Sequence, residues 1–183
     1  YVSDLLEGDA EHGVSSGVVY LGGNVYVRGA KTDGTAWRVG VQDPHAPEDG
    51  SAYAAILLLQ DAFAVTSGGY QRNFEMDGQL YHHILDPATG RPAQSGLLSV
   101  TVVADATGRT QLEDDPGNGT MCDALSTALF VLGEERALDL WRAEKEAFDL
   151  VLVTEDGRVV LTEGLADRYE AIEGSGYTYE IVS

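Results

Sequence analysis

The sequence has little basic charge and almost no cysteine. Only 11 Lys and Arg residues stand against 30 Asp and Glu residues, so the formal net charge is −19 at pH 7. A surface this acidic repels polyanions, which argues against nucleic acids and anionic membrane surfaces as partners. Cys122 is the only cysteine, so the chain cannot form an internal disulfide. One cysteine does not decide the redox compartment.

Long hydrophobic runs are also absent. The longest one, from Ala54 to Leu59, is far shorter than the roughly 18 residues that a membrane-spanning helix needs. Hydrophobic residues make up 44% of the 183 residues, which is ordinary for a globular protein and sufficient for one sizeable core. We find no internal repeat and no linker, so the whole chain is treated as part of a single domain.

A helix is predicted from Met121 to Leu132, with Thr120 as its N-cap and Gly133 as the residue that ends it. Its apolar positions recur at helical spacing. The predicted core-facing stripe consists of Ala124, Leu125, Ala128, Leu129 and Leu132.

The same helix carries oxygen-bearing side chains that could bind a metal. Asp123 and Thr127 are four residues apart and therefore one turn apart on one face, and Ser126 can flank them. Carboxylate and hydroxyl oxygens suit Mg²⁺ better than Zn²⁺. Taken alone, the helix has a simpler interpretation, in which Asp123 complements the helix dipole and the hydroxyls are small packing residues.

A polar turn precedes this helix in the sequence. His83 stands just before Asp86-Pro87 and Thr89-Gly90, pairs that are typical of turns. A histidine can act as a general base near neutral pH. The alternative is a structural turn with a surface or hydrogen-bonded histidine.

The pattern of apolar, β-branched and aromatic residues along the rest of the sequence predicts an α+β fold, with mixed sheets and packed helices. Strands are expected at 17–21, 25–28, 37–41, 52–59, 63–66, 79–84, 97–103, 148–154, 158–162 and 177–182. Helices are expected at 2–11, 121–132 and 134–145, with a short one at 165–169.

Five blocks of the sequence, taken together, resemble the ApbE-type flavin transferases, the FAD:protein FMN transferases. The blocks are Leu21–Asn24, Trp37–Pro44, Ala64–Arg72, Tyr81–Pro92 and Cys122–Gly133. Each block alone is a weak signal, whereas five in the right order are a strong one. The resemblance implies the fold of that family for nearly the whole chain.

The resemblance also implies an activity. Such enzymes use a divalent metal, usually Mg²⁺, to transfer FMN from FAD to a Thr or Ser hydroxyl of a target flavoprotein, and AMP leaves. The target is typically a subunit of a membrane redox complex, and the enzyme is an extracytoplasmic lipoprotein held at the membrane. Two alternatives stay open: an FAD pyrophosphatase that releases FMN and AMP, and a flavin-nucleotide-binding module without catalysis.

The family's functional positions can be carried onto this sequence. Asp123 and Thr127 match metal ligands, and Ser126 falls on a neighbouring position. The FAD-binding positions are matched by Gly22, Gly23, Asn24, Ser67, Gly68, His83 and Ile84. His83 is the predicted catalytic base for the incoming hydroxyl.

Two departures from the family pattern generate further expectations. The resemblance starts at Tyr1 in the middle of a helix, so we expect 1–183 to be the C-terminal portion of a flavin transferase domain. An upstream segment or a partner chain would then complete the site, and the isolated chain would be a poor transferase. The link from Asp105 to Thr120 is long and acidic, and it is expected to be a solvated loop.

Overall fold

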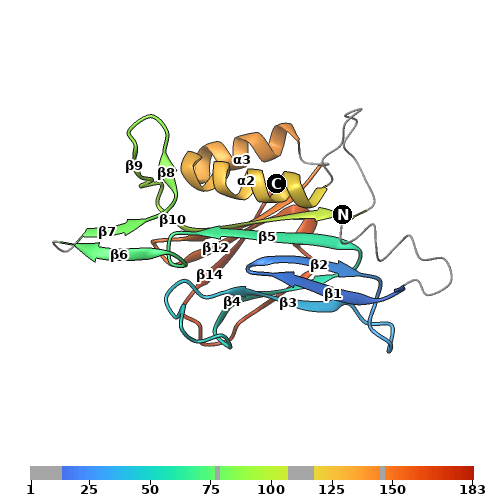
Figure 1. Cartoon of the computed structure of the whole chain (residues 1–183). Helices are drawn as coiled ribbons and strands as arrows, with labels where there is room; N and C mark the ends of the chain where they lie inside the picture. The colour runs from blue at the N-terminus through green and yellow to red at the C-terminus, as the bar shows by residue number, and fades with distance from the viewer. Residues whose placement is uncertain (1–13, 77–78, 107–117, 145–146) are drawn as a thin grey trace.

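A seven-stranded sheet forms the middle layer of the protein, with two helices over one face and a smaller sheet over the other (Figure 1). The computed structural model describes residues 14–76, 79–106, 118–144 and 147–183. The strands are β1 Gly17–Leu21, β2 Asn24–Arg28, β3 Trp37–Gln42, β4 Tyr53–Leu59, β5 Ala62–Gly68, β6 Asn73–Met76, β7 Gln79–His82, β8 Leu85–Asp86, β9 Arg91–Pro92, β10 Leu97–Asp105, β11 Asp149–Thr154, β12 Arg158–Thr162, β13 Tyr169–Ala171 and β14 Thr178–Val182. Within these described ranges, the helices are α2 Asn118–Leu132, α3 Glu134–Ala143 and the 3₁₀ turn η1 Glu163–Leu165.

The central strand β10 shows why the sheet is covered on both sides. As far as the structure describes the chain, the strands of the large sheet run in the order β1-β2-β5-β10-β11-β12-β14; the β12–β14 pair is parallel and the other pairs are antiparallel. Side chains alternate along a strand. Val100 and Val102 therefore join the core beneath the helices, whereas Val103 joins the core beneath the small sheet. Because both faces are buried, β10 is mostly apolar, and its hydroxyl-bearing residues Ser99 and Thr101 are buried as well.

Helix α2 packs on β5 and β10. Three residues of the predicted stripe, Leu125, Leu129 and Leu132, do pack against the core beneath the helix. Its buried residues are Asn118, Cys122, Ser126, Leu129 and Phe130. Ala124 and Ala128, which were expected in the core, are exposed. The buried face therefore combines Leu129 and Phe130 with the small residues Cys122 and Ser126, whose burial an apolar count cannot anticipate. The helix also begins at Asn118, so the predicted N-cap Thr120 lies inside its first turn.

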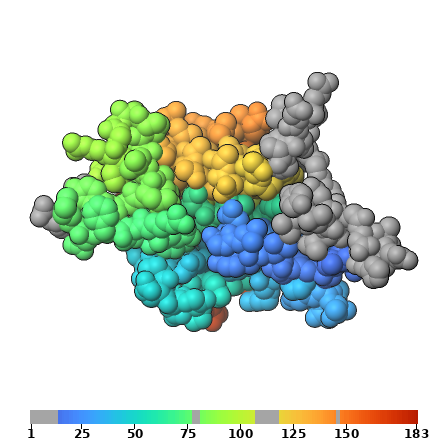
Figure 2. Space-filling model, viewed as in Figure 1, coloured from blue at the N-terminus to red at the C-terminus, as the bar shows by residue number. Residues whose placement is uncertain are grey.

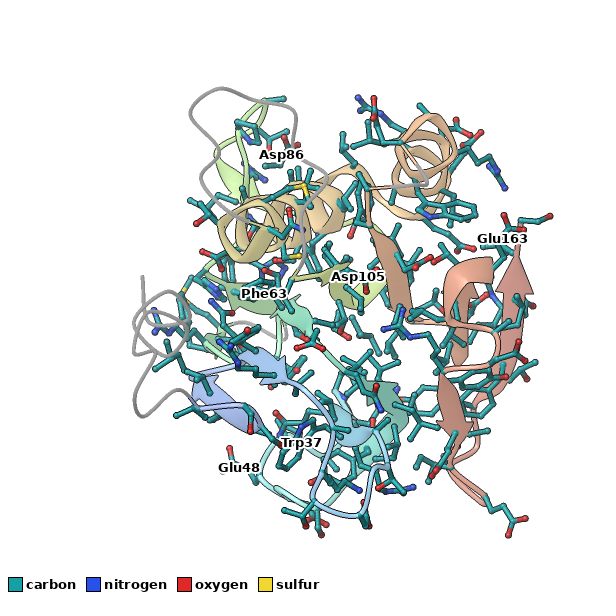
Figure 3. The ribbon with its side chains drawn as sticks, turned by 90° about the vertical axis from the view of Figure 1, so that its right-hand side faces the viewer. Trp37, Glu48, Phe63, Asp86, Asp105 and Glu163 are labelled. Atoms are coloured by element: carbon teal, nitrogen blue, oxygen red, sulfur yellow. The ribbon has the colours of Figure 1, made fainter. Side chains whose placement is uncertain are left out.

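The small sheet, in the order β13-β4-β3, closes the second core. Leu57, Leu59 and Val41 from this sheet are almost fully buried against the large one. Figure 3 shows Trp37, at the start of β3, in this lower layer, and Phe63 of β5 beneath α2. The Phe63 ring stacks on Tyr26 of β2 at a centroid distance of 4.7 Å.

Two short hairpins, β6–β7 and β8–β9, stand at one end of the sheet (Figure 1). On β6–β7, the rings of Phe74 and Tyr81 stack with centroids 5.2 Å apart. The β8–β9 hairpin rises beside the helices, where Ile84 is buried in the same core as Phe130.

The α+β architecture is confirmed, while several element predictions need correction. The strand expected at 79–84 ends at His82, because the chain turns there into β8. The helix expected at 165–169 is instead η1, which ends at Leu165, followed by β13, whose pairing with β4 extends the backbone. Strands β6, β8, β9 and β13 were not predicted. The helix expected at 2–11 and most of the acidic link lie outside the described residues.

Gly133, the predicted end of α2, has a backbone that favours glycine. Its φ is 81° and its ψ is 170°, and an added Cβ would lie 3.1 Å from the carbonyl oxygen of Ser95. We predict that Gly133→Ala lowers the free energy of unfolding by about 1–3 kcal/mol, the usual cost of forcing a side chain into this region. Urea unfolding measures the change. Gly50→Ala is the control, since a Cβ added there would meet no atom within 4 Å; equal losses in both variants would contradict the prediction.

Candidate functional site

Residues from three elements meet where α2 crosses the ends of β2 and β5. Asn24 opens β2 and lies opposite Val65 of β5 in the sheet register. Ser67 is close to the end of β5, and α2 packs across that strand. Figure 2 shows the surfaces of α2 (yellow), the β1–β2 hairpin (blue) and the hairpins that follow β5 (green) adjoining on one face. The fold therefore brings together residues that are far apart in the sequence.

Ser67 joins the strand to the helix through hydroxyl contacts. Its Oγ lies 2.9 Å from Ser126 Oγ and 2.9 Å from Thr127 Oγ1. The Ser126 hydroxyl, which is fully buried, also donates to the carbonyl oxygen of Asp123 at 3.0 Å. A buried hydroxyl needs partners to offset its lost hydration. These contacts consequently set how α2 is rotated and placed over β5.

Asp123 faces solvent beside the cluster of hydroxyls formed by Ser67, Ser126 and Thr127. Asn24 Nδ2 donates to Asp123 Oδ1 at 3.3 Å, and both Asp123 and Thr127 are exposed. Within the described parts of the chain, no group of three or more His, Cys, Asp or Glu side chains could hold a metal. A metal here would therefore rest on one carboxylate and on hydroxyl oxygens, a donor set that suits Mg²⁺.

The Gly22–Gly23 turn leads into Asn24 with a backbone that glycine adopts readily. The φ angles are 60° at Gly22 and 105° at Gly23. Gly68, which follows Ser67, has a different reason to lack a side chain, because an added Cβ would lie 2.4 Å from the Tyr70 ring. The predicted ligand-binding glycines thus lie directly next to Asn24 and Ser67.

His83 and Ile84 lie in the link between β7 and β8. The His83 side chain is exposed, and its backbone N–H donates to the carbonyl oxygen of Arg72 at 3.2 Å. Its imidazole makes no hydrogen bond within the described residues. Ile84 is only 3% exposed and packs in the core that contains Phe130. The structure therefore leaves His83 available to a ligand and uses Ile84 to anchor the turn.

Cys122 is next to Asp123 but points the opposite way. It is fully buried, and burial raises the pKa of its thiol to about 12. A thiol that stays protonated is a poor nucleophile and a poor metal ligand. Cys122 accordingly serves as a core residue of α2.

Sequence reasoning missed two features of this region. The Asn24–Asp123 contact spans 99 residues and follows only from the sheet order. His82 was assigned no role, although its ring packs against Phe130 of α2. The sequence feature that could have pointed to His82 is the pair His82-His83 directly before Ile84.

Comparison with known proteins gives consistent matches. Residues 2–152 match the family model described as the ApbE family. The chain is 37% identical over 170 residues to a protein of Treponema pallidum named FAD:protein FMN transferase, covering 88% of this chain and 43% of that protein. It is 35% identical over 157 residues to the protein of the same name from Escherichia coli K12, covering 86% and 39%.

Solved structures agree with the sequence matches. The ApbE protein of Thermotoga maritima aligns with a TM-score of 0.65 at 35% identity, covering 81% of this chain and 43% of that one. The flavin transferase ApbE of Vibrio cholerae aligns with a TM-score of 0.62 at 27% identity, covering 93% and 45%. The chain therefore spans less than half the length of the relatives it matches.

A double-mutant cycle can measure the contact between β5 and α2. We predict that Ser67→Ala and Thr127→Ala are non-additive in the free energy of unfolding by about 0.5–1.5 kcal/mol, the usual value of one hydrogen bond. The control cycle pairs Ser67→Ala with Ser51→Ala, because the Ser51 hydroxyl bonds Asp49 instead. Additive effects in the Ser67–Thr127 cycle would show that their hydroxyls do not interact.

Proposed function

The chain belongs to the ApbE family, and we propose that a protein containing it transfers FMN from FAD to a Thr or Ser hydroxyl of a target flavoprotein, with release of AMP. The names of the relatives support the donor, the group transferred and a protein acceptor. The observation that carries the proposal is the convergence of Asn24, Ser67, Asp123 and Thr127 from three elements at one surface.

A divalent metal, Mg²⁺ in our proposal, fits this donor set. Asp123 and Thr127 offer exposed oxygens one helical turn apart. Because Asn24 occupies Asp123 Oδ1, the other carboxylate oxygen is the better placed one for a cation. Ser126 is less well placed to contribute, because its hydroxyl is fully buried and already contacts Ser67 and the Asp123 carbonyl oxygen. When held by Asp123 and Thr127, the metal would supply positive charge that offsets the charge developing on the phosphoryl group.

The transfer exchanges one bond to phosphorus for another. The acceptor hydroxyl oxygen bonds to the FMN phosphorus, and the bond from that phosphorus to the bridging oxygen of AMP breaks. The hydroxyl proton must be taken up, and we assign this role to His83, whose exposed imidazole can act as a general base. The Gly22–Gly23 turn can bring backbone N–H groups close to the phosphates, because neither residue carries a Cβ.

We also propose an extracytoplasmic location for the protein, with a lipoprotein anchor, and a subunit of a membrane redox complex as the target. This part of the proposal is supported by the family resemblance alone. Among the helices that the structure describes, none has the length and apolarity needed to cross a membrane.

The proposal is tested in a protein of the relatives' full length that contains this chain. The protein is incubated with FAD, Mg²⁺ and a threonine-containing acceptor domain, and AMP and acceptor-bound flavin are quantified by chromatography and in-gel fluorescence. Equal amounts of AMP and bound FMN support a transferase. AMP with free FMN supports a pyrophosphatase instead, and binding of FAD without AMP release supports a binding module.

Replacing the carboxylate should abolish metal dependence. We predict that Asp123→Ala and Asp123→Asn lower kcat/KM by roughly 100-fold or more, because charge stabilisation by a bound metal contributes several kcal/mol. Mg²⁺ binding, measured by calorimetry, should weaken in parallel. Asp139→Asn is the matched control, since it removes an exposed helical carboxylate from α3. Unchanged Mg²⁺-dependent turnover in Asp123→Ala would remove Asp123 from the metal site.

Replacing the proposed base should slow the chemical step and leave the fold alone. We predict that His83→Ala lowers kcat by about 10²–10⁴-fold, the usual contribution of a positioned general base. Added imidazole should restore part of the rate, because the exposed position of His83 gives a small base access. A kcat within a few-fold of the parent value would exclude His83 as the base.

A further inference from the structure

His82 is adjacent to His83 in the sequence, but its ring is turned toward the protein interior. Its Nε2 lies 3.1 Å from the carbonyl oxygen of Ala93. Because a carbonyl oxygen only accepts, Nε2 must carry the hydrogen. The other ring nitrogen, Nδ1, is buried and has no hydrogen-bond partner among the residues that the structure describes. The imidazole thus makes one directed bond and leaves a buried acceptor unpaired.

The His82 ring also touches two other elements of the fold. It meets the Phe130 ring of α2 edge-on, with centroids 5.6 Å apart and an interplanar angle of 89°. On another side it lies against Gly69, where an added Cβ would be only 2.9 Å from the His82 Cδ2. One side chain therefore connects the loop after β5, the helix α2 and the segment after β9.

Each of these contacts is close to a residue of the proposed site. Gly69 follows Gly68 and is two residues from Ser67, and Phe130 is three residues along α2 from Thr127. The Ala93 N–H donates to the carbonyl oxygen of Ile84 at 3.0 Å, which ties the same segment to the His83–Ile84 link. The interior ring is therefore placed to relate the His83 turn to the helix that carries Asp123.

We propose that His82 is a positioning residue, which holds the His83 turn in register with the metal-binding face of α2. The inference rests on the proposed function. An unpaired buried nitrogen is costly, and a phenyl ring would avoid it. The imidazole offers in exchange a bond of fixed direction to Ala93, which a phenyl ring cannot make. Small displacements of catalytic groups have large effects, since a shift of about 1 Å can cost 100-fold in rate.

The first test compares two variants of the full-length protein, one that removes the hydrogen bond from residue 82 to the Ala93 carbonyl oxygen and one that retains it. His82→Leu should lower kcat by roughly 10- to 100-fold, with the KM for FAD changed less than about threefold, because positioning and not binding is lost. His82→Gln, which keeps a nitrogen donor at a similar reach, should recover most of the rate. A folded His82→Leu protein with the parent kcat would overturn the proposal, and so would a His82→Gln protein that is as slow as His82→Leu.

The second test moves the ring without changing it. Gly69 is buried, and its backbone does not require glycine, so Gly69→Ala adds a methyl group against His82 with no added backbone strain. We expect kcat to fall by about 10-fold, again with little change in KM. Gly50→Ala, where the added methyl group meets no atom within 4 Å, should have no effect. Equal activity in the Gly69→Ala and Gly50→Ala proteins would contradict the proposal.

The third readout does not depend on activity. Exchange of the Ala93 amide hydrogen, followed by NMR, should become about 10-fold faster in His82→Leu and stay near the parent rate in His82→Gln. If the unsubstituted protein transfers no FMN, the proposed function fails, while this measurement still reports on His82. Unchanged Ala93 exchange in His82→Leu would overturn the positioning role whatever the activity.

Discussion

The contact between the end of β5 and the middle of α2 is the constraint on which the candidate site depends. Most helix–sheet contacts rely on apolar packing, and Leu129 and Phe130 supply that here. At the site itself the interface is polar, because Ser67 and the fully buried Ser126 face each other. Such a pair is stable only at hydrogen-bonding distance, so it fixes the helix more narrowly than apolar contacts would. The outer face of α2, with its carboxylate and hydroxyl, is oriented as a consequence.

Local pattern was enough to predict most of the secondary structure. Apolar, β-branched and aromatic residues predict the strands that begin at Gly17 and Arg158. Helical spacing of apolar residues and the glycine between them predict the two helices that flank Gly133. The burial of Ser126 on α2 did not follow, because it depends on the residue that lies opposite, which is Ser67 of β5. The strands β8 and β13 are only two and three residues long, too short to show a sequence pattern. They are strands because they pair with β9 and β4, respectively.

The candidate site likewise has features that could be predicted from the sequence and features that could not. The spacing of Asp123 and Thr127 is a property of one helix and could be read from the sequence. The contact between Asn24 and Asp123 could not, since it requires β2, β5 and α2 to be placed together. The resemblance to a family supplied the residues without their geometry. The family resemblance identified the exposed His83 as a site residue. It gave no role to His82, because the contacts of the His82 ring depend on the fold.

The composition of the candidate site is compatible with the strongly acidic charge of the chain. A protein with a net charge of −19 would repel a pyrophosphate ligand, and a metal site built from several carboxylates would add to that repulsion. Here the polar groups at the surface are one carboxylate, an amide and hydroxyls. If a divalent cation binds to this single carboxylate as proposed, it would keep a net positive charge, which would be available to the phosphates. In the proposed site, the small number of carboxylate ligands would thus leave a bound ion able to attract FAD to an acidic protein.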